Sequence, residues 1–299
     1  MKKPQPHAPP ENLVIYEVKG IPEEAHHPDL GRGFLGYWTE GDYTFFFFGQ
    51  EPEERVNRFL KERPWLELRH VHRMKYSDWQ DGADFSPISI GPLVISPAWS
   101  DFQVTNPDLS HIRLDPGLAF GFGGHPTTMA CLEFLVRVYR EERPSRVLDL
   151  GAGTGVLSLA AARLGAEEVK AVELNHIAFE TARKNVILNE LEPVIETVHG
   201  PAERCLEFPA ELVCSNLHLP VQEAILESGG FEKRRWVILS GLFHSQAEKM
   251  ETALKCSGYL VFDRIREARW SSLLMKMNRW ITLEYLAFNC RSLFSVSYF

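Results

Sequence analysis

A short apolar run that ends in three closely spaced glycines is the feature that most constrains the fold. Val147-Leu148-Asp149-Leu150 has the composition of a buried strand, and Gly151-Ala152-Gly153-Thr154-Gly155 follows at once. An apolar helical pattern begins at Val156. Glycines are needed where a backbone turns sharply and approaches a ligand without interference from a Cβ atom. The segment therefore predicts a strand, a ligand-binding turn and a helix of an α/β domain.

The spacing of these glycines indicates the kind of ligand. A dinucleotide site requires G-x-G-x-x-G, whereas Val156 follows Gly155 here and leaves G-x-G-x-G. This spacing argues against a nicotinamide dehydrogenase and suits a ligand without phosphates, whose amino-acid end crosses the loop. Glu173 ends the next predicted strand, where a carboxylate can accept hydrogen bonds from ribose hydroxyls. Asp149 either accepts from a ligand ammonium group or only stabilises the turn, and an ordinary turn with an exposed glutamate is the structural alternative.

Predicted strands and helices alternate from residue 127 to residue 266, which is typical of a doubly wound, mostly parallel sheet. The expected strands are Arg146–Leu150, Glu168–Glu173, Val194–Val198, Leu212–Ser215, Trp236–Ser240 and Tyr259–Arg266. The expected helices are Thr128–Tyr139, Val156–Leu164, Ala178–Leu188 and Ser245–Cys256. Ligands of such sheets bind beyond the carboxyl ends of the strands, at the switch point.

The chain before this domain has the pattern of a small α+β unit. Its expected strands are Leu13–Val18, Gly33–Trp38, Tyr43–Phe48, Leu66–His72 and Ile88–Ser96, with a helix that opens at Pro52. We therefore expect a flexible tail at residues 1–11, an α+β domain at 12–97 and a linker at 98–112. An α/β domain at 113–277 and a C-terminal extension at 278–299 complete the chain.

Two further segments carry candidate site residues. Asn216 follows the fourth expected strand of the α/β domain, and its amide can both donate and accept; a turn role is the alternative. Nearby His218 could move a proton, although a surface or packing histidine is commoner. Residues 114–128 hold four glycines, as a lid or hinge would, and Thr127 or Thr128 is a natural N-cap for the next helix.

Composition narrows the function classes. The formal net charge of −8 argues against a broad nucleic-acid footprint, because phosphate binding needs clustered Lys and Arg. The five cysteines show no metal-type spacing, so we expect reduced thiols and no metal site. The stretch Trp280–Phe288 is too short to cross a bilayer, and Met1–Pro10 lacks a signal-peptide pattern. We expect a cytoplasmic monomer that binds neither membrane nor nucleic acid.

Taken together, these residues resemble the ribosomal protein L11 methyltransferase family. The segment from Asp115 to Thr128 is similar to the family pattern D-P-G-x-A-F-G-T-G-x-H-x-T-T. The D-x-G-x-G-x-G loop at Asp149–Gly155, the acid at Glu173 and the N-L at Asn216 resemble the family's other motifs. The likeness extends from about Asp78 to Met277, and more loosely to the preceding domain.

The resemblance implies a Rossmann-like class I methyltransferase domain that binds S-adenosylmethionine, preceded by a ferredoxin-like domain that grips ribosomal protein L11. It implies N-methylation of lysine side chains or of the N-terminus, with Asn216 as the catalytic residue that positions the amine. By position, the resemblance implies cofactor and substrate contacts at Phe120, Thr127, Gly153, Glu173 and Asn216. Together with Asp149, Gly151 and Gly155 of the glycine loop, these are the expected cofactor-binding residues.

Several positions depart from the family pattern. Phe122 replaces a threonine beside the cofactor, and Glu173 replaces the commoner aspartate. His26–Asp29 stands where a full first helix is expected, and Arg279–Phe299 extends past the usual end. Two alternatives therefore stay open: a methyltransferase for another protein lysine or a small amine, or a cofactor-binding homologue in which Phe122 blocks the methyl site. An RNA methyltransferase is disfavoured by the acidic composition.

Overall fold

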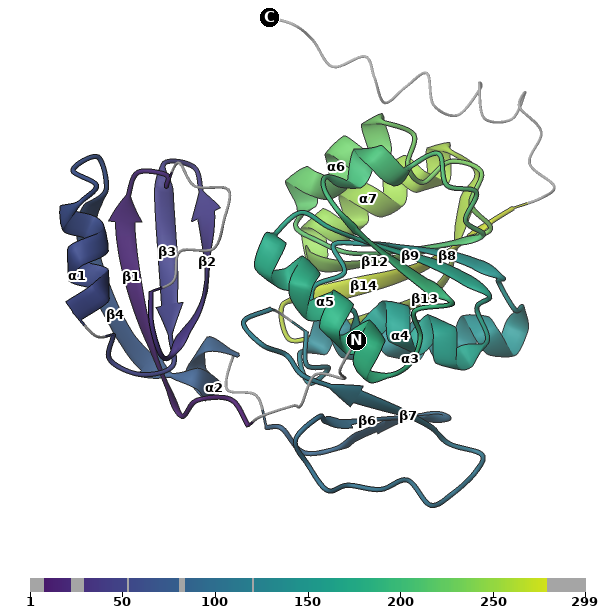
Figure 1. Cartoon of the computed structure of the whole chain (residues 1–299). Coiled ribbons are helices and arrows are strands. Elements are labelled where there is room, and N and C mark those ends of the chain that lie inside the picture. The colour runs from purple at the N-terminus through teal and green to yellow at the C-terminus, as the bar shows by residue number, and fades with distance from the viewer. Residues whose placement is uncertain (1–7, 23–29, 53, 81–83, 120, 279–299) are drawn as a thin grey trace, which may run out of the picture.

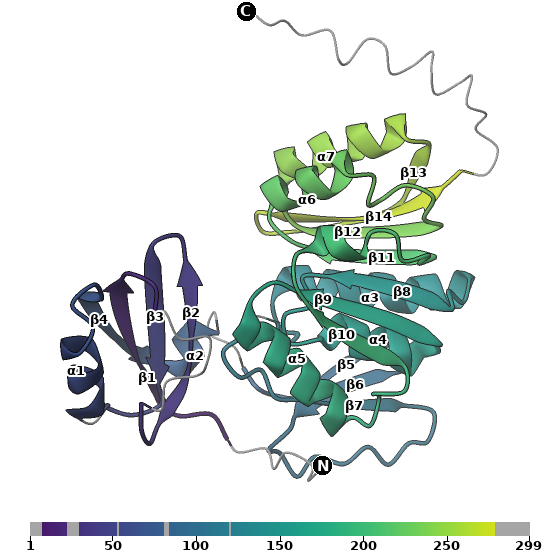
Figure 2. The same cartoon turned by 45° about the horizontal axis from the view of Figure 1, so that its top comes forward.

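The structure is a computed structural model that describes residues 8–22, 30–52, 54–80, 84–119 and 121–278. Figure 1 shows a small sheet with one helix against it and a larger body built around a wide sheet. A third, short sheet lies beside the larger body, below helices α3 and α4 in the view of Figure 2. Among the described residues, no helix is long and apolar enough to cross a membrane.

The small unit is a four-stranded antiparallel sheet with the strand order β2-β3-β1-β4. Its elements are β1 (Asn12–Lys19), β2 (Phe34–Glu40), β3 (Tyr43–Phe48), α1 (Glu54–Lys61), β4 (Glu67–Lys75) and α2 (Tyr76–Trp79). This strand order and pairing are those of a split β-α-β arrangement, which supports the expected ferredoxin-like unit. The stretch from His26 to Asp29, where we expected a shortened first helix, lies outside the described residues.

The two faces of the small sheet have different neighbours. Helix α1 covers one face, where Val56 and Phe59 pack against alternate strand residues: Val14, Val18, Phe46 and Phe48. The intervening residues point to the opposite face, because side chains alternate along a strand. There, Leu13, Ile15 and Phe47 form a cluster with Leu118 and Ile177 of the larger body. The small unit is thus joined to the larger body through a buried apolar contact.

The wide sheet has seven strands in the order β10-β9-β8-β11-β12-β14-β13. Its strands are β8 (Arg146–Leu150), β9 (Glu168–Glu173), β10 (Ile195–His199), β11 (Leu212–Asn216), β12 (Trp236–Phe243), β13 (Tyr259–Glu267) and β14 (Trp270–Met277). The first five strands of this order run parallel, and β14 is antiparallel to both of its neighbours. The chain moves outward from β8 to β10 and then returns to β11 on the other side. The switch point therefore lies between β8 and β11.

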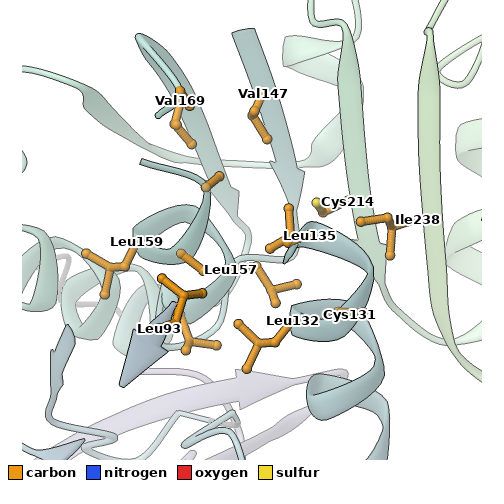
Figure 3. Close-up of a cluster of buried hydrophobic side chains, with 14 of the residues drawn as sticks. Leu93, Cys131, Leu132, Leu135, Val147, Leu157, Leu159, Val169, Cys214 and Ile238 are labelled. Carbon is orange, nitrogen blue, oxygen red and sulfur yellow. The ribbon is translucent and has the colours of Figure 1, made fainter. Parts of the chain in front are cut away.

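Helices cover both faces of this sheet (Figure 2). They are α3 (Pro126–Glu141), α4 (Val156–Leu164), α5 (His176–Leu188), α6 (Leu219–Glu227) and α7 (His244–Cys256), with a short 3-10 helix η1 (Ala202–Cys205). Val147 packs with α3 and α4, whereas its neighbour Leu148 packs with α6 and α7. Figure 3 shows Leu135 of α3 next to Val147, with Leu157 of α4 and Leu132 of α3 deeper in the same cluster on the first face. The expected α/β doubly wound domain is confirmed.

The third sheet consists of β5 (Ile88–Ile90), β6 (Leu93–Pro97) and β7 (Ser110–Leu114). We expected one strand over Ile88–Ser96, but Gly91 turns the chain with φ +54° and divides it into two. Leu93 packs against Leu132 of α3, in the apolar cluster that also contains Val147. We therefore propose that the boundary between the domains lies before residue 88 rather than at residue 97, and that the linker ends before β7.

Strand β14 and helix α6 were among the elements absent from the sequence expectations. Strand β14 forms an antiparallel hairpin with β13 through a tight turn in which Ala268 has φ +48°. No glycine marks this turn, and glycine is the usual signal of a positive φ. Helix α6 begins with Leu219 and Pro220, and a proline in the first turn is compatible with a helix because its missing N–H has no partner there.

Candidate active site

The predicted site residues come together at one edge of the wide sheet. Parallel strands β8, β9 and β11 all have their carboxyl ends at this edge. The glycine loop follows β8, Glu173 is the last residue of β9, and Asn216 is the last residue of β11. Because β8 and β11 flank the switch point, the edge between them is the place where an open α/β sheet forms its ligand crevice. The fold therefore brings three separate sequence motifs together at the switch point of the sheet.

The glycine loop turns sharply between β8 and α4. The N–H groups of Gly151 and Ala152 both donate to the carbonyl oxygen of Val172 on β9, at 2.9 and 3.0 Å. Gly151, Gly153 and Gly155 have φ values of +74°, +56° and +81°. A Cβ atom added to Gly151 would lie 2.3 Å from Cδ2 of Leu217. The loop is therefore held against the strand ends in a conformation that excludes a side chain at its first position.

Glu173 is fixed beside this loop at the end of β9. One carboxylate oxygen accepts a hydrogen bond from the N–H of Gly153 at 2.9 Å, and the other accepts from the N–H of Asn175 at 2.8 Å. Asn175 is itself the N-cap of α5 and accepts from the N–H of Ile177. The carboxylate thus has a set orientation on a half-buried surface, as a diol acceptor requires.

Asp149 lies beneath the loop rather than on its open side. Its side chain is buried, and one carboxylate oxygen accepts a hydrogen bond from the Ser158 hydroxyl of α4 at 2.6 Å. Burial raises the pKa of Asp149 to about 6, against the lowering effect of the Ser158 hydrogen bonds. These contacts support a role in holding the turn against α4. A contact between Asp149 and the ligand stays a prediction.

Asn216 is linked to the start of α3. Its side-chain nitrogen donates to the Thr127 hydroxyl at 3.3 Å, and this hydroxyl lies 2.7 Å from Nδ1 of His125. The expectation that Thr127 or Thr128 caps α3 is wrong. His125 is the N-cap, because Pro126 occupies the first turn and the imidazole accepts from the N–H of Thr127. The Thr127 hydroxyl is thereby available to orient Asn216.

The glycine-rich segment before α3 is bonded to the glycine loop between β8 and α4. The Thr154 hydroxyl donates to the carbonyl oxygen of Gly121 at 2.6 Å. The side chain of Asn185 on α5 donates to the carbonyl oxygens of Asp115 and Thr154, and accepts from the N–H of Asp115. One buried amide therefore connects both loops. Predicted cofactor contact Phe120 belongs to this segment but lies outside the described residues.

Sequence reasoning missed the role of Asn185, although a signal was present. Asn185 of α5 and Asn189, the C-cap of that helix, lie four residues apart, and Asn189 binds both backbone groups of Arg113 as Asn185 binds those of Asp115. Asparagine is unfavourable in helix interiors, because its side chain competes for backbone groups. Two asparagines at this spacing therefore indicate that a helix holds an extended segment through side-chain amides.

Phe122, which departs from the family pattern, packs into the core. Its side chain is 3% exposed, and its ring centroid lies 5.0 Å from that of Phe85 in an edge-to-face contact. It belongs to the same apolar cluster as Val156 and Leu157 of α4. The added bulk is therefore accommodated by the core, which weakens the alternative that Phe122 blocks a methyl site.

The residues at the switch point provide the chemical groups that S-adenosylmethionine would require. A fixed carboxylate at Glu173 suits ribose hydroxyls, and the glycines of the loop carry no Cβ atom that would hinder an amino-acid moiety crossing it. Helix starts at α3 and α4 favour a carboxylate group. No group of three His, Cys, Asp or Glu side chains that could hold a metal ion occurs in the part of the chain that the structure describes. His218, the N-cap of α6, keeps its proton-handling role as a prediction.

Comparison with known proteins agrees with this geometry. The model of the ribosomal protein L11 methyltransferase (PrmA) family matches residues 22–278. The ribosomal protein L11 methyltransferase of Desulforamulus reducens is 32% identical over 221 residues, which is 71% of this chain and 68% of that protein. The protein of the same name from Bacillus cereus is 30% identical over 69% of this chain and 67% of its own length.

A solved structure gives the same answer for the fold. The crystal structure of ribosomal protein L11 methylase from Lactobacillus delbrueckii subsp. bulgaricus aligns with a TM-score of 0.55 and 28% identity. The alignment covers 64% of this chain and 99% of that structure. With these motifs gathered at the switch point and the family model matched over residues 22–278, this chain belongs to the ribosomal protein L11 methyltransferase family and is a methyltransferase.

Proposed function

We propose that the protein binds S-adenosylmethionine across Gly151–Gly155 and Glu173 and methylates amino groups of ribosomal protein L11. One observation carries this proposal: Glu173 and Asn216 both lie at strand ends around one switch point. Glu173 is also hydrogen-bonded to Gly153 of the glycine loop. The names of the related proteins support L11 as the substrate. The small domain would contact the protein substrate, and the enzyme would act as a monomer.

The cofactor supplies an electrophilic methyl group on a sulfonium centre. The task of the protein is to orient the acceptor amine along the methyl–sulfur axis and to exclude water. Glu173 would hold the ribose, and the loop amides together with the start of α3 would hold the amino-acid end. Asp149 would act from beneath by fixing the loop against Ser158.

Asn216 would position the amine. The side-chain nitrogen of Asn216 donates a hydrogen bond to the Thr127 hydroxyl. The side-chain oxygen is therefore the atom that can accept from an amine N–H. This contact directs the nitrogen lone pair away from Asn216. The hydrogen bond that Asn216 donates to the Thr127 hydroxyl, and the contact of that hydroxyl with Nδ1 of His125, keep the amide in one orientation.

The acceptor must be neutral when it reacts. A free lysine amine has a pKa near 10.4 and an α-amino group a pKa near 8. Burial of the amine in a closed site disfavours its charged form and lowers this pKa. No dedicated strong base is therefore required, and deprotonation can precede closure of the site.

Asn216→Ala tests the role of this residue. We expect a loss of about a hundredfold in kcat, because misplacement of a reacting group carries a cost of this order. Asn216→Ala should still bind the cofactor well enough to be saturated, which calorimetry would establish before rates are compared. A variant that methylates L11 at the normal rate would remove Asn216 from the mechanism.

A second candidate is methylation of another protein lysine or of a small amine. Such an enzyme would have the same catalytic features in its larger domain as an L11 methyltransferase. Only the substrate that the small domain contacts would differ. Incubation of the enzyme with labelled cofactor and either L11 or a cell extract depleted of L11 separates the two possibilities. Label that appears only in the depleted extract would favour the second candidate.

A further inference from the structure

Helix α2 of the small unit contacts the backbone of the glycine-rich segment. The Tyr76 hydroxyl donates to the carbonyl oxygen of Gly117. The indole N–H of Trp79 donates to the carbonyl oxygen of Leu118 at 3.2 Å. The Gln80 amide donates to the carbonyl oxygen of Ala119 at 3.0 Å. Three side chains from one short element thus bind three consecutive carbonyl groups.

Apolar packing holds this contact in place. The Leu118 side chain is buried in the cluster that contains Leu13 and Ile15 of the small sheet. The Tyr76 ring stacks on that of Phe85, with centroids 5.9 Å apart. Figure 1 shows α2 beneath the small sheet, on the side of the larger body. The segment at residues 117–119 is therefore gripped by both its backbone and a side chain.

The other end of the same segment is bound to the cofactor loop. Thr154 holds the carbonyl oxygen of Gly121, Asn185 holds both Asp115 and Thr154, and Gly153 is bonded to Glu173. Hydrogen bonds thus connect α2 to the glycine-rich segment, and this segment to the loop between β8 and α4. The segment is the part of the chain that spans the small unit and the crevice.

We propose that Tyr76, Trp79 and Gln80 are positioning residues for cofactor binding. They hold residues 117–119 in a fixed position beside the loop between β8 and α4 that would bind the cofactor. This inference rests on the proposed binding of S-adenosylmethionine in the crevice. Without these donors the segment would occupy other positions for part of the time, and the apparent affinity falls by the fraction of molecules that remain competent.

Docking of α2 and binding of the cofactor should favour each other. If docking of α2 favours cofactor binding, cofactor binding must favour docking of α2 by the same factor. Amide exchange in α2 should therefore slow when the cofactor is added. A role of α2 in stability alone would leave this exchange unchanged.

The test uses the full chain with Tyr76→Phe and Trp79→Phe, which remove a donor and keep a ring. A net hydrogen bond of this kind corresponds to about a two- to tenfold change in equilibrium. We expect calorimetry to show a rise of this size in the dissociation constant for S-adenosylmethionine. The KM for the cofactor should rise likewise, whereas kcat at saturation should stay unchanged.

Tyr259→Phe is the matched control. The Tyr259 hydroxyl also donates to backbone carbonyl oxygens, those of Phe231 and Arg234, but from β13 at the far edge of the sheet. This variant should lower the melting temperature and leave cofactor affinity within twofold of the parent. Unchanged affinity in Tyr76→Phe and Trp79→Phe would overturn the inference. A parent protein that fails to bind the cofactor would instead overturn the proposed function.

Discussion

The backbone N–H of Gly153 and the carboxylate of Glu173 are joined by a hydrogen bond of 2.9 Å across the ends of β8 and β9. This bond connects the two motifs that were singled out separately in the sequence. It sets the carboxylate at the side of the loop where a ribose would lie. The proposed cofactor site therefore depends on the contact between two strands as well as on each motif.

Replacement of Glu173 should weaken cofactor binding. A hydrogen bond to a charged group is worth about 1.5–3 kcal/mol, so Glu173→Ala should raise the dissociation constant of S-adenosylmethionine by about ten- to a hundredfold. Glu196→Ala on β10 is the control, since this exposed carboxylate pairs with Lys170. Titration calorimetry on both variants is decisive. Equal affinities would show that Glu173 does not touch the ribose.

A methyl group at Gly241 should disturb Asn216 through the backbone. A Cβ atom at Gly241, where φ is +78°, would lie 2.7 Å from the carbonyl oxygen of Leu217, the residue after Asn216. We expect Gly241→Ala to lower the free energy of unfolding by about 2 kcal/mol or more and to reduce kcat. Gly41→Ala meets open space at φ +56° and reports the backbone cost alone. Equal stability losses in the two variants, with normal kcat, would refute this effect.

Asp149 should make the stability depend on pH. Its pKa is raised from 3.8 to about 6 by burial, so the folded state favours the protonated form. The stability that protonation provides is complete below pH 3.8 and is lost as the pH rises through 6. Relative to Asp149→Asn, the parent should lose about 3 kcal/mol between pH 3.5 and pH 7. Denaturant unfolding at both pH values measures this, and a constant difference would contradict it.

Asn185→Ala should affect both loops at once. Loss of the amide leaves the backbone groups of Asp115 and the carbonyl oxygen of Thr154 without this partner in a buried site. We expect the free energy of unfolding to fall by about 2–4 kcal/mol, and cofactor affinity to fall with it. Asn189→Ala, which releases Arg113 instead, should be destabilising with a smaller effect on affinity. Cofactor titrations of the two variants compare them directly.

The strands and helices around the glycine loop were predictable from the sequence because local pattern determines them. The β8 strand, the loop and α4 follow from an apolar run, three glycines and a helical repeat. The hairpin of β13 and β14 was missed because its turn carries Ala268 and Arg269 in place of glycine. The position of β14 inside the sheet, between β12 and β13, depends on long-range packing that the local sequence pattern does not show.

The site residues also divide into those set by local sequence pattern and those set by long-range contacts. Glu173 and Asn216 were predictable because the ends of parallel strands meet at one edge. Asn185 and Tyr76 were missed, because their roles arise from contacts with segments about 70 and 41 residues away. The buried environment of Asp149 was also missed, since the orientation of its side chain toward Ser158 depends on how α4 returns over β8.

The most direct measurement is methyl transfer to L11. The purified protein is incubated with labelled S-adenosylmethionine and recombinant L11 from the same source, and mass spectrometry locates the label. We predict methyl groups on lysine side chains or on the N-terminal amine of L11, and their loss with Asn216→Ala. Cofactor binding without label on L11 would contradict the proposed substrate.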